Sequence, residues 1–301
     1  MSLNQPKFLV SSAFIHSASL LLAALCWGVV WYPYRLMAQA GVAAVSASFY
    51  TYSTVIILAG IVCFRHWRGI FKLPLSIFWL ALAAGWTNLA YVLAVIDGEV
   101  MRVMLLFYLS PLWTLILAHF WLKEHIDKRG LMIMALSLMG AFIMLYDITG
   151  KASAWPLPRN TAEWFALTSG IGFAISNVIT RKSTHLTLRS KSFAVWVGVL
   201  LMAILAMPLV KETIPSPSFF SLNECLVILA IALSLIAATL LTQYGITQMP
   251  ATRASVLFLF ELVVAAVTSY FLANETMAIN EWIGGSLIVA ASIFAALINH
   301  D

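Results

Sequence analysis

Two stretches decide the fold: RVMLLFYLSPLWTLILAHFWLKE, from Arg102 to Glu124, and RASVLFLFELVVAAVTSYFLANE, from Arg253 to Glu275. They align without a gap at an offset of 151 residues, with the Arg, a Leu-Phe pair, a later Phe and the final Glu in register. Polar and charged positions match as well as apolar ones. We therefore interpret the match as an internal repeat rather than as chance similarity between Leu-rich helices.

The repeat extends beyond these two stretches. The preceding apolar run of each half keeps the offset of 151 residues, and the first run of each half aligns at an offset of about 146. The polar and aromatic positions paired in this way are Asn88 with Thr239, Tyr91 with Thr242, Trp31 with Asn177, and Arg35 with Arg181.

The composition is that of a protein dissolved in lipid. The chain is 62% hydrophobic and 10% charged, whereas soluble domains carry about 25% charged residues. A membrane-spanning helix needs roughly 20 apolar residues, and ten such runs are present. They are Ser17–Met37, Ala43–Phe64, Leu73–Ile96, Arg102–Leu122, Gly130–Asp147, Thr161–Thr180, Phe193–Val210, Leu222–Ile246, Ala251–Ala273 and Ile279–Ile298.

These runs predict an all-α integral membrane protein of ten transmembrane helices. We expect a first five-helix repeat over residues 1–148, a polar linker over 149–160 and a second repeat over 161–301. Because five is an odd number, the second repeat has to enter the membrane upside down. Inverted repeats of this kind are typical of secondary transporters.

Basic residues predict the orientation. Of the 17 Lys and Arg residues, 12 fall in segments that face one side if the N-terminus is inside, and 5 face the other. The positive-inside rule then places both termini in the cytoplasm. The net charge of +5 is thereby explained as a topology signal, so we expect no nucleic-acid partner.

No nucleotide, hydrolase or metal motif is found, and three scattered cysteines suggest neither disulfides nor zinc. We expect no cofactor and no metal.

The chain resembles the drug/metabolite transporter superfamily, in particular its EamA-type branch with two repeats. The resemblance lies in Trp27-Gly28, Ser110-Pro111, the two helices ending in Glu124 and Glu275, and Glu261. It departs from the family at Leu262, where a proline often follows the Glu, and at Phe173-Ala174, where the first half has Trp-Gly. The resemblance implies a central cavity between two inverted five-helix halves. Within the superfamily the chain looks most like bacterial exporters of aromatic and other amino acids.

Polar and aromatic side chains in the middle of the predicted helices are candidates for a substrate site, because lipid offers them no hydrogen bonds. Trp27 and Trp31 lie one turn apart, and their indole rings suit a flat or cationic ligand. The alternatives are core packing for the aromatic residues and hydrogen bonding between helices for the polar ones. The candidates are Trp27, Trp31, Asn88, Tyr91, Tyr108, Asn177, Thr239 and Gln243.

Glu261 is the one carboxylate deep within a predicted span. An isolated charge there would cost several kcal/mol. The acid could relay a proton, bind a substrate amine or hold neighbouring helices together, and the sequence leaves these three roles open.

The sequence thus predicts a secondary exporter of the inner membrane that moves small metabolites, with amino acids bearing aromatic or apolar side chains as leading substrates. A carrier of nucleotide sugars or phosphorylated metabolites is the alternative, although it would need several basic residues in its cavity. An intramembrane enzyme would need paired catalytic groups at depth, so we expect no enzymatic activity. The inverted repeat argues against a channel or a purely structural bundle.

Overall fold

The structure, a computed structural model, describes residues 12–63, 74–98, 100–125, 128–146, 158–211, 216, 220–273 and 277–297. Helices account for almost all of them. They are α1 (Ser12–Gln39), α2 (Ala44–Cys63), α3 (Leu75–Asp97), α4 (Val100–Phe107), α5 (Ser110–Leu117), the π-helical turn η2 (Ala118–Leu122), α6 (Lys128–Leu145), α7 (Thr161–Lys182), α8 (Leu188–Val210), α9 (Leu222–Gln248), α10 (Ala251–Phe258), α11 (Phe260–Ala273) and α12 (Ile279–Leu297).

The predicted fold class is confirmed. Within the described ranges, nine helical stretches are long and apolar enough to cross a membrane. One of them runs through α4, α5 and η2 together, and another through α10 and α11. The remaining predicted span is α7, which has 22 residues but carries Glu163, Arg181 and Lys182 near its two ends. The chain is therefore a multi-pass membrane protein.

Polar residues at the ends of the apolar runs determine where helices begin. Asn160 caps α7 by accepting a hydrogen bond from the Glu163 backbone N–H at 2.9 Å, and the Glu163 carboxylate accepts one from the Arg159 N–H at 2.9 Å. Ser221 and Glu224 form a capping box at the start of α9. Such caps satisfy backbone donors that a helix leaves unpaired.

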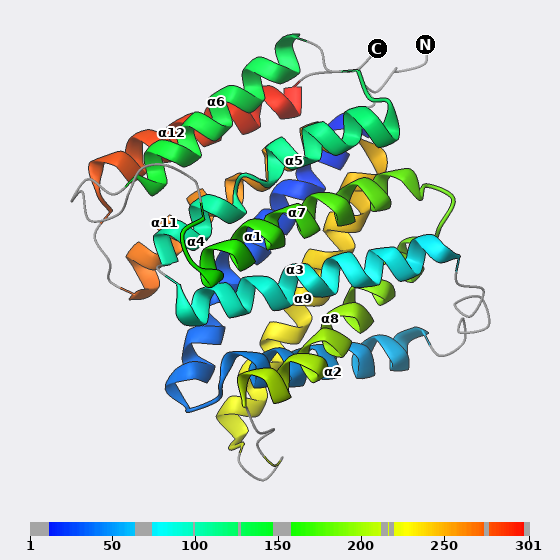
Figure 1. Cartoon of the computed structure of the whole chain (residues 1–301), viewed down its shortest axis with the longest axis vertical. Coiled ribbons are helices and arrows are strands. Elements are labelled where there is room, and N and C mark those ends of the chain that lie inside the picture. Colours follow the sequence, from blue (N-terminus) through cyan, green and yellow to red (C-terminus); the bar gives the residue numbers. More distant parts are fainter. Residues whose placement is uncertain are drawn as a thin grey trace, which may run out of the picture.

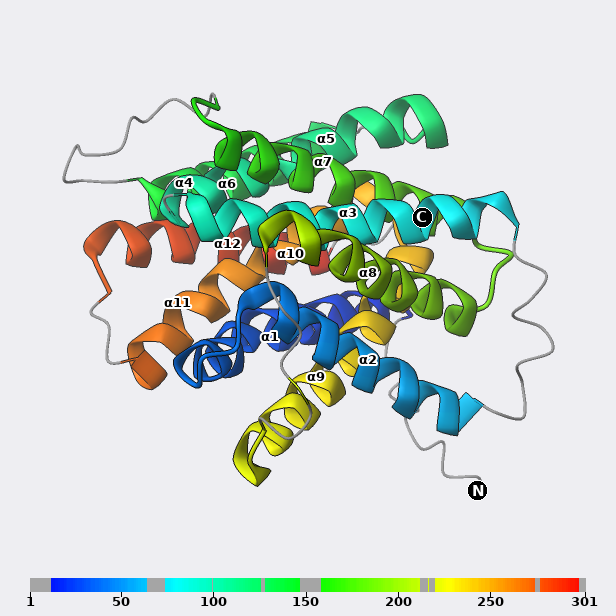
Figure 2. The ribbon, with the colours of Figure 1, turned by 60° about the horizontal axis from the view of Figure 1, so that its bottom comes forward.

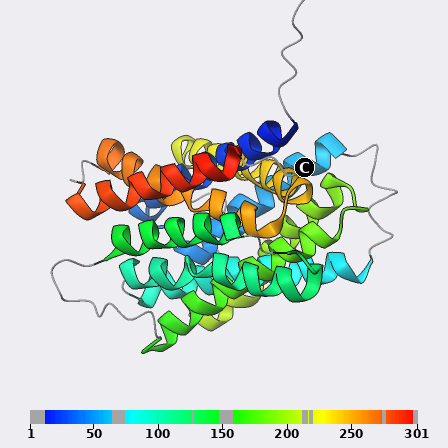
Figure 3. The same cartoon turned by 90° about the horizontal axis from the view of Figure 1, so that it is seen from above.

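The helices pair in the pattern that an internal repeat predicts. The repeat offsets match α3 with α9, α7 with α1, and α8 with α2. In the structure, α3 packs against α7 and α8, whereas α9 packs against α1 and α2 (Figures 1 and 2). The last helices of the two halves, α6 and α12, lie side by side, green beside red in Figure 3. Each half thus contributes helices that pack against the other half.

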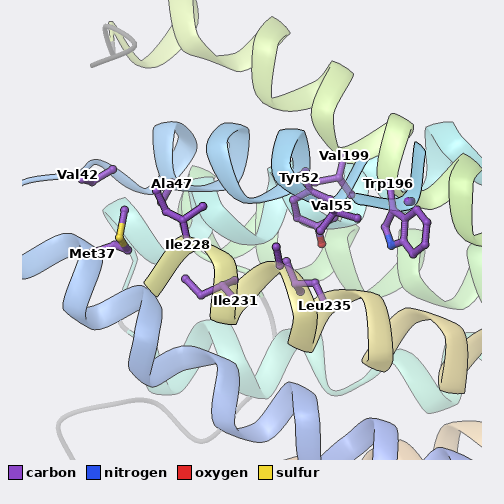
Figure 4. Packing of buried hydrophobic residues seen from close by; sticks show 12 residues of the cluster. Met37, Val42, Ala47, Tyr52, Val55, Trp196, Val199, Ile228, Ile231 and Leu235 are labelled. Atoms are coloured by element: carbon purple, nitrogen blue, oxygen red, sulfur yellow. The ribbon is translucent and has the colours of Figure 1, made fainter. Parts of the chain in front are cut away.

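Buried apolar side chains join these pairs. One cluster lies between α1, α2, α8 and α9 and includes Met37, Tyr52, Trp196 and Leu235 (Figure 4). Glycines add a second kind of contact to these buried clusters. Helices in lipid associate through small residues, which let their backbones approach closely. The tightest approach involves Gly198 of α8: a Cβ there would lie 2.0 Å from the Ala81 carbonyl oxygen of α3.

One end of the bundle gathers the beginning of α1 and the end of α12. The Arg253 guanidinium, near the start of α10, donates to Ser17 Oγ at 3.1 Å and to the Ala296 carbonyl at 2.9 Å. We call this the terminal end. If a chain crosses the membrane an even number of times, its first helix begins and its last helix ends on the same side.

Candidate functional site

Two membrane-spanning segments are interrupted at repeat-related positions. The first breaks at Tyr108 and Leu109, between α4 and α5, and the second breaks at Leu259, between α10 and α11. Tyr108 and Leu259 are separated by the repeat offset of 151 residues. Broken helices near the membrane midplane are where secondary transporters of several folds bind their substrates.

The two breaks have different local causes. Pro111 lies in the first turn of α5 and has no N–H to continue the helical bonding of α4. Its counterpart is Leu262, so the sequence gives no such reason for a break in the second half. That segment nevertheless breaks, and the Leu262 N–H bonds to the Leu259 carbonyl at 3.1 Å in a tighter turn. Here α1 packs directly on the backbone: a Cβ on Gly28 would lie 2.9 Å from the Glu261 carbonyl oxygen.

Aromatic rings meet between the breaks. The Phe173 ring of α7 lies 5.8 Å from the ring of Phe107 and 5.4 Å from that of Phe258, between centroids. Phe107 and Phe258 are the phenylalanines of the repeated Leu-Phe pair, and Phe173 occupies the position that Trp27 has in the first half. Trp27 and Phe173 both pack against the buried cluster that contains Phe258. We call Trp27, Phe107, Phe173 and Phe258 the aromatic centre.

The aromatic centre was only partly predicted. Sequence reasoning selected Trp27 and missed the three phenylalanines as site residues. The signal was present, because Phe107 and Phe258 are identical residues at matching positions of the repeat. What the sequence does not indicate is that α7 brings Phe173 between them.

An acid lies beside the aromatic centre. Glu261 is in the first turn of α11, where unpaired backbone N–H groups favour a negative charge. Its carboxyl is hydrogen-bonded to the Tyr108 hydroxyl, and Tyr91 of α3 is close enough to interact electrostatically. The Tyr91 ring lies 5.1 Å from that of Phe107. The predicted residues Tyr91, Tyr108 and Glu261 are therefore brought together from both halves.

A second predicted group meets where α7 faces α9. Asn177, Thr239 and Gln243 are buried, with 2%, 2% and 5% of their surface exposed. Gln243 Oε1 accepts a hydrogen bond from Thr180 Oγ1 at 3.0 Å. Asn177 Nδ2 and Thr239 Oγ1 have no hydrogen-bond partner within the described part of the chain. Each such buried group costs about 1–3 kcal/mol until it is paired.

The remaining two predicted residues are Trp31 and Asn88. The Trp31 indole N–H donates to Thr268 Oγ1 at 3.0 Å, and the Thr268 hydroxyl approaches the Gly28 carbonyl at 3.2 Å. The Trp31 indole therefore links α1 to α11 by a hydrogen bond, whereas the structural alternative considered from the sequence was core packing. Asn88 lies one turn before Tyr91 on α3 and is partly exposed.

Comparison with known proteins gives consistent results. The sequence pattern of the EamA-like transporter family matches residues 16–146 and again residues 160–297. An S-adenosylmethionine uptake transporter of Rickettsia prowazekii (strain Madrid E) is 27% identical over 215 residues, which are 71% of this chain and 68% of the relative. An uncharacterized transporter of Archaeoglobus fulgidus is 25% identical over 215 residues, 69% of this chain and 72% of its own.

A solved crystal structure of another protein has a similar fold. It superposes with a TM-score of 0.73 over 93% of this chain and 95% of its own, at 16% identity. At this identity the likeness concerns the fold alone.

Proposed function

Because the chain belongs to the EamA-like transporter family, we propose that it carries small amphipathic metabolites with an amino-acid group, foremost amino acids with aromatic or apolar side chains. The observation that carries this proposal is the aromatic centre between two broken helices, with Glu261 beside it. A transporter of this family has a small-molecule substrate and works in a lipid bilayer. The substrate class and the binding residues are our proposal.

Each part of such a substrate has a suitable group in the site. The Glu261 carboxylate attracts an ammonium group, and the face of an aromatic ring of the substrate stacks on Phe173 or Trp27. The substrate carboxylate accepts hydrogen bonds from Asn177 Nδ2 and Thr239 Oγ1, which lack partners in the described structure. Binding therefore pairs groups that are costly to leave unpaired.

Transport then follows from the repeat. In transporters built from inverted repeats, one group of helices rocks against the other and exposes a fixed midplane site to each side in turn. The broken segments α4–α5 and α10–α11 lie at this site. The sequence contains no nucleotide-binding motif, so we propose that a substrate or ion gradient drives the movement.

S-adenosylmethionine is a second candidate, supported by the name of the Rickettsia relative and by Glu261. This ligand combines an amino-acid end and a flat adenine with a positively charged sulfur. A carboxylate among aromatic rings suits such a cation. The Rickettsia relative is named for uptake, whereas the sequence suggested export, and we retain export as the proposal for amino acids. For phosphorylated metabolites we find less support, because Arg181 and Lys191 lie at the terminal end rather than at the aromatic centre.

Substitution of Phe173 tests the proposed stacking. We expect Phe173→Ala to reduce transport of Trp and Phe several-fold more than transport of Ala and Thr, because stacking contributes about 0.5–1.5 kcal/mol beyond the buried area. Initial rates in liposomes with matched amounts of folded protein measure this. The control is Phe142→Ala, whose ring is 39% exposed on α6. Equal losses for all four substrates would make Phe173 a packing residue and contradict the proposal.

The membrane and the orientation are also proposals. The bias of Lys and Arg supports an inner-membrane protein with both termini, and hence the terminal end, in the cytoplasm. His185 lies in the loop after α7 at that end, and Ala278 lies before α12 at the opposite end; both are exposed. In a background with Ser at Cys26, Cys63 and Cys225, a membrane-impermeant maleimide should label Ala278→Cys but not His185→Cys in intact cells. The reverse pattern would overturn the orientation.

A further inference from the structure

Polar side chains continue from the candidate site towards the terminal end. On α7, Thr180 and Arg181 lie three and four residues after Asn177, so each of them neighbours Asn177 on the helix surface. On α9, Thr239, Gln243 and Thr247 share a face, at spacings of four. Thr180 bonds to Gln243 at 3.0 Å, and Arg181 Nη1 donates to the Thr247 carbonyl at 2.6 Å. We call these six residues the polar seam.

Charged groups close the polar seam at the terminal end. Arg181 Nε lies 3.5 Å from Glu124 Oε1. The Glu124 carboxylate also accepts the Ala251 N–H at the start of α10, at 3.1 and 3.3 Å. Lys191 of α8 is 1% exposed, and its ammonium donates to Thr247 Oγ1 and to the Thr180 carbonyl. Glu124 thus ties α7 to α10.

The neighbouring helix pairs α3–α7 and α1–α9 differ from the α7–α9 pair in the kind of contact they make. A Cβ on Gly172 of α7 would lie 2.8 Å from Thr87 Oγ1 of α3, and a Cβ on Gly245 of α9 would lie 2.4 Å from Leu20 Cγ of α1. At these glycines the backbones of α7 and α9 are therefore in close contact with side chains of α3 and α1. Between α7 and α9, the groups that meet are polar side chains, and two of them lack partners in the described structure. Water or a polar ligand could replace those contacts, whereas nothing of similar size could enter the glycine contacts.

We propose that the polar seam is the half of the substrate path that leads to the terminal end, closed in this structure by the Glu124–Arg181 ion pair. The proposal rests on the proposed transport function and adds a route to it. When α7 with α3 separates from α9 with α1, the seam becomes a polar channel from the aromatic centre to the aqueous side. Arg181 and Lys191 then attract the carboxylate of a substrate, which is the group that Asn177 and Thr239 receive.

Thiol labelling tests the path without any substrate. In the cysteine-replaced background, Asn177→Cys should react slowly with a water-soluble thiol reagent applied at the terminal end. Adding Glu124→Gln should speed the reaction at least fivefold, because the amide still accepts the Ala251 N–H but no longer attracts Arg181. Adding Glu281→Gln, which alters an acid at the opposite end, should leave the rate unchanged. If Asn177→Cys reacted at the same rate with and without Glu124→Gln, the Glu124–Arg181 ion pair would not be the element that closes the path.

Cross-linking provides the second test. Cysteines at Thr180 and Gln243, joined by a short bifunctional thiol reagent, should stop transport, and reductive cleavage should restore it. Across the α3–α7 pair, Ser169 Oγ donates to the Thr87 carbonyl at 2.7 Å. Cysteines at Thr87 and Ser169 should leave transport intact when joined. Full transport with the first pair cross-linked would refute the path. Because labelling needs no substrate, a failed substrate assay would count against the proposed function and leave the path to be judged by labelling.

Discussion

Glu261→Gln is expected to lower transport of amino-acid substrates at least about thirtyfold while the protein remains folded. In our account the carboxylate attracts the substrate ammonium within a space of low polarity. Removing one partner of a buried charge pair costs about 2–5 kcal/mol, and about 1.4 kcal/mol corresponds to a factor of ten. Gln has the same shape and its carbonyl still accepts the Tyr108 hydroxyl, so the local packing persists.

The measurement is the initial rate of Phe uptake into liposomes, with thermal unfolding in detergent followed in parallel. Glu281→Gln is the matched control, because Glu281 lies in the first turn of α12 and caps that helix by accepting the Ala278 N–H. If Glu261→Gln lowered the unfolding temperature and reduced transport of all substrates in proportion, Glu261 would be a structural acid. A loss confined to the response to a proton gradient would instead identify it as the proton carrier.

Gly198→Ala is expected to destabilise the protein strongly, although it adds only one methyl group. The added Cβ would lie 2.0 Å from the oxygen and 2.6 Å from the carbon of the Ala81 carbonyl. These are backbone atoms, so no side-chain rotation relieves the overlap and α3 has to move away from α8. Overpacking of this kind costs about 1–3 kcal/mol and sometimes more.

Thermal unfolding and the monodisperse fraction after size exclusion in detergent measure this effect. Gly285→Ala is the control, since the nearest atom to its added Cβ would be 3.9 Å away and the change should be tolerated. Equal stability of the two variants would show that α3 and α8 do not approach as closely as described.

The positions of the helices along the chain were predictable, because lipid imposes a length and a composition on every spanning segment. The repeat was predictable because it preserves polar residues, including the Glu at position 124. The break at Leu259 was not, because the proline that explains the first break is replaced by Leu262 and the local sequence gives no other signal. Packing of α1 against the backbone accompanies that break, and such a contact is not visible in one sequence.

The surroundings of charged residues near helix ends were the other feature that the sequence did not predict. Arg181 and Lys191 were counted as loop charges that set the orientation, and Lys191 lay outside the predicted helix, which was expected to start at Phe193. In the structure α8 begins at Leu188, and Lys191 is buried against α7 and α9. A basic residue at the end of an apolar run looks the same in the sequence whether water or another helix surrounds it.

Counterflow in liposomes tests the central claim most directly. Liposomes that contain the purified protein and unlabelled Phe are diluted into a trace of labelled Phe, and label accumulates only if one site faces the two sides in turn. We predict accumulation that excess external Trp or S-adenosylmethionine suppresses and that a sugar phosphate leaves unchanged. No accumulation, or suppression by the sugar phosphate alone, would contradict an aromatic site for amino-acid-like substrates.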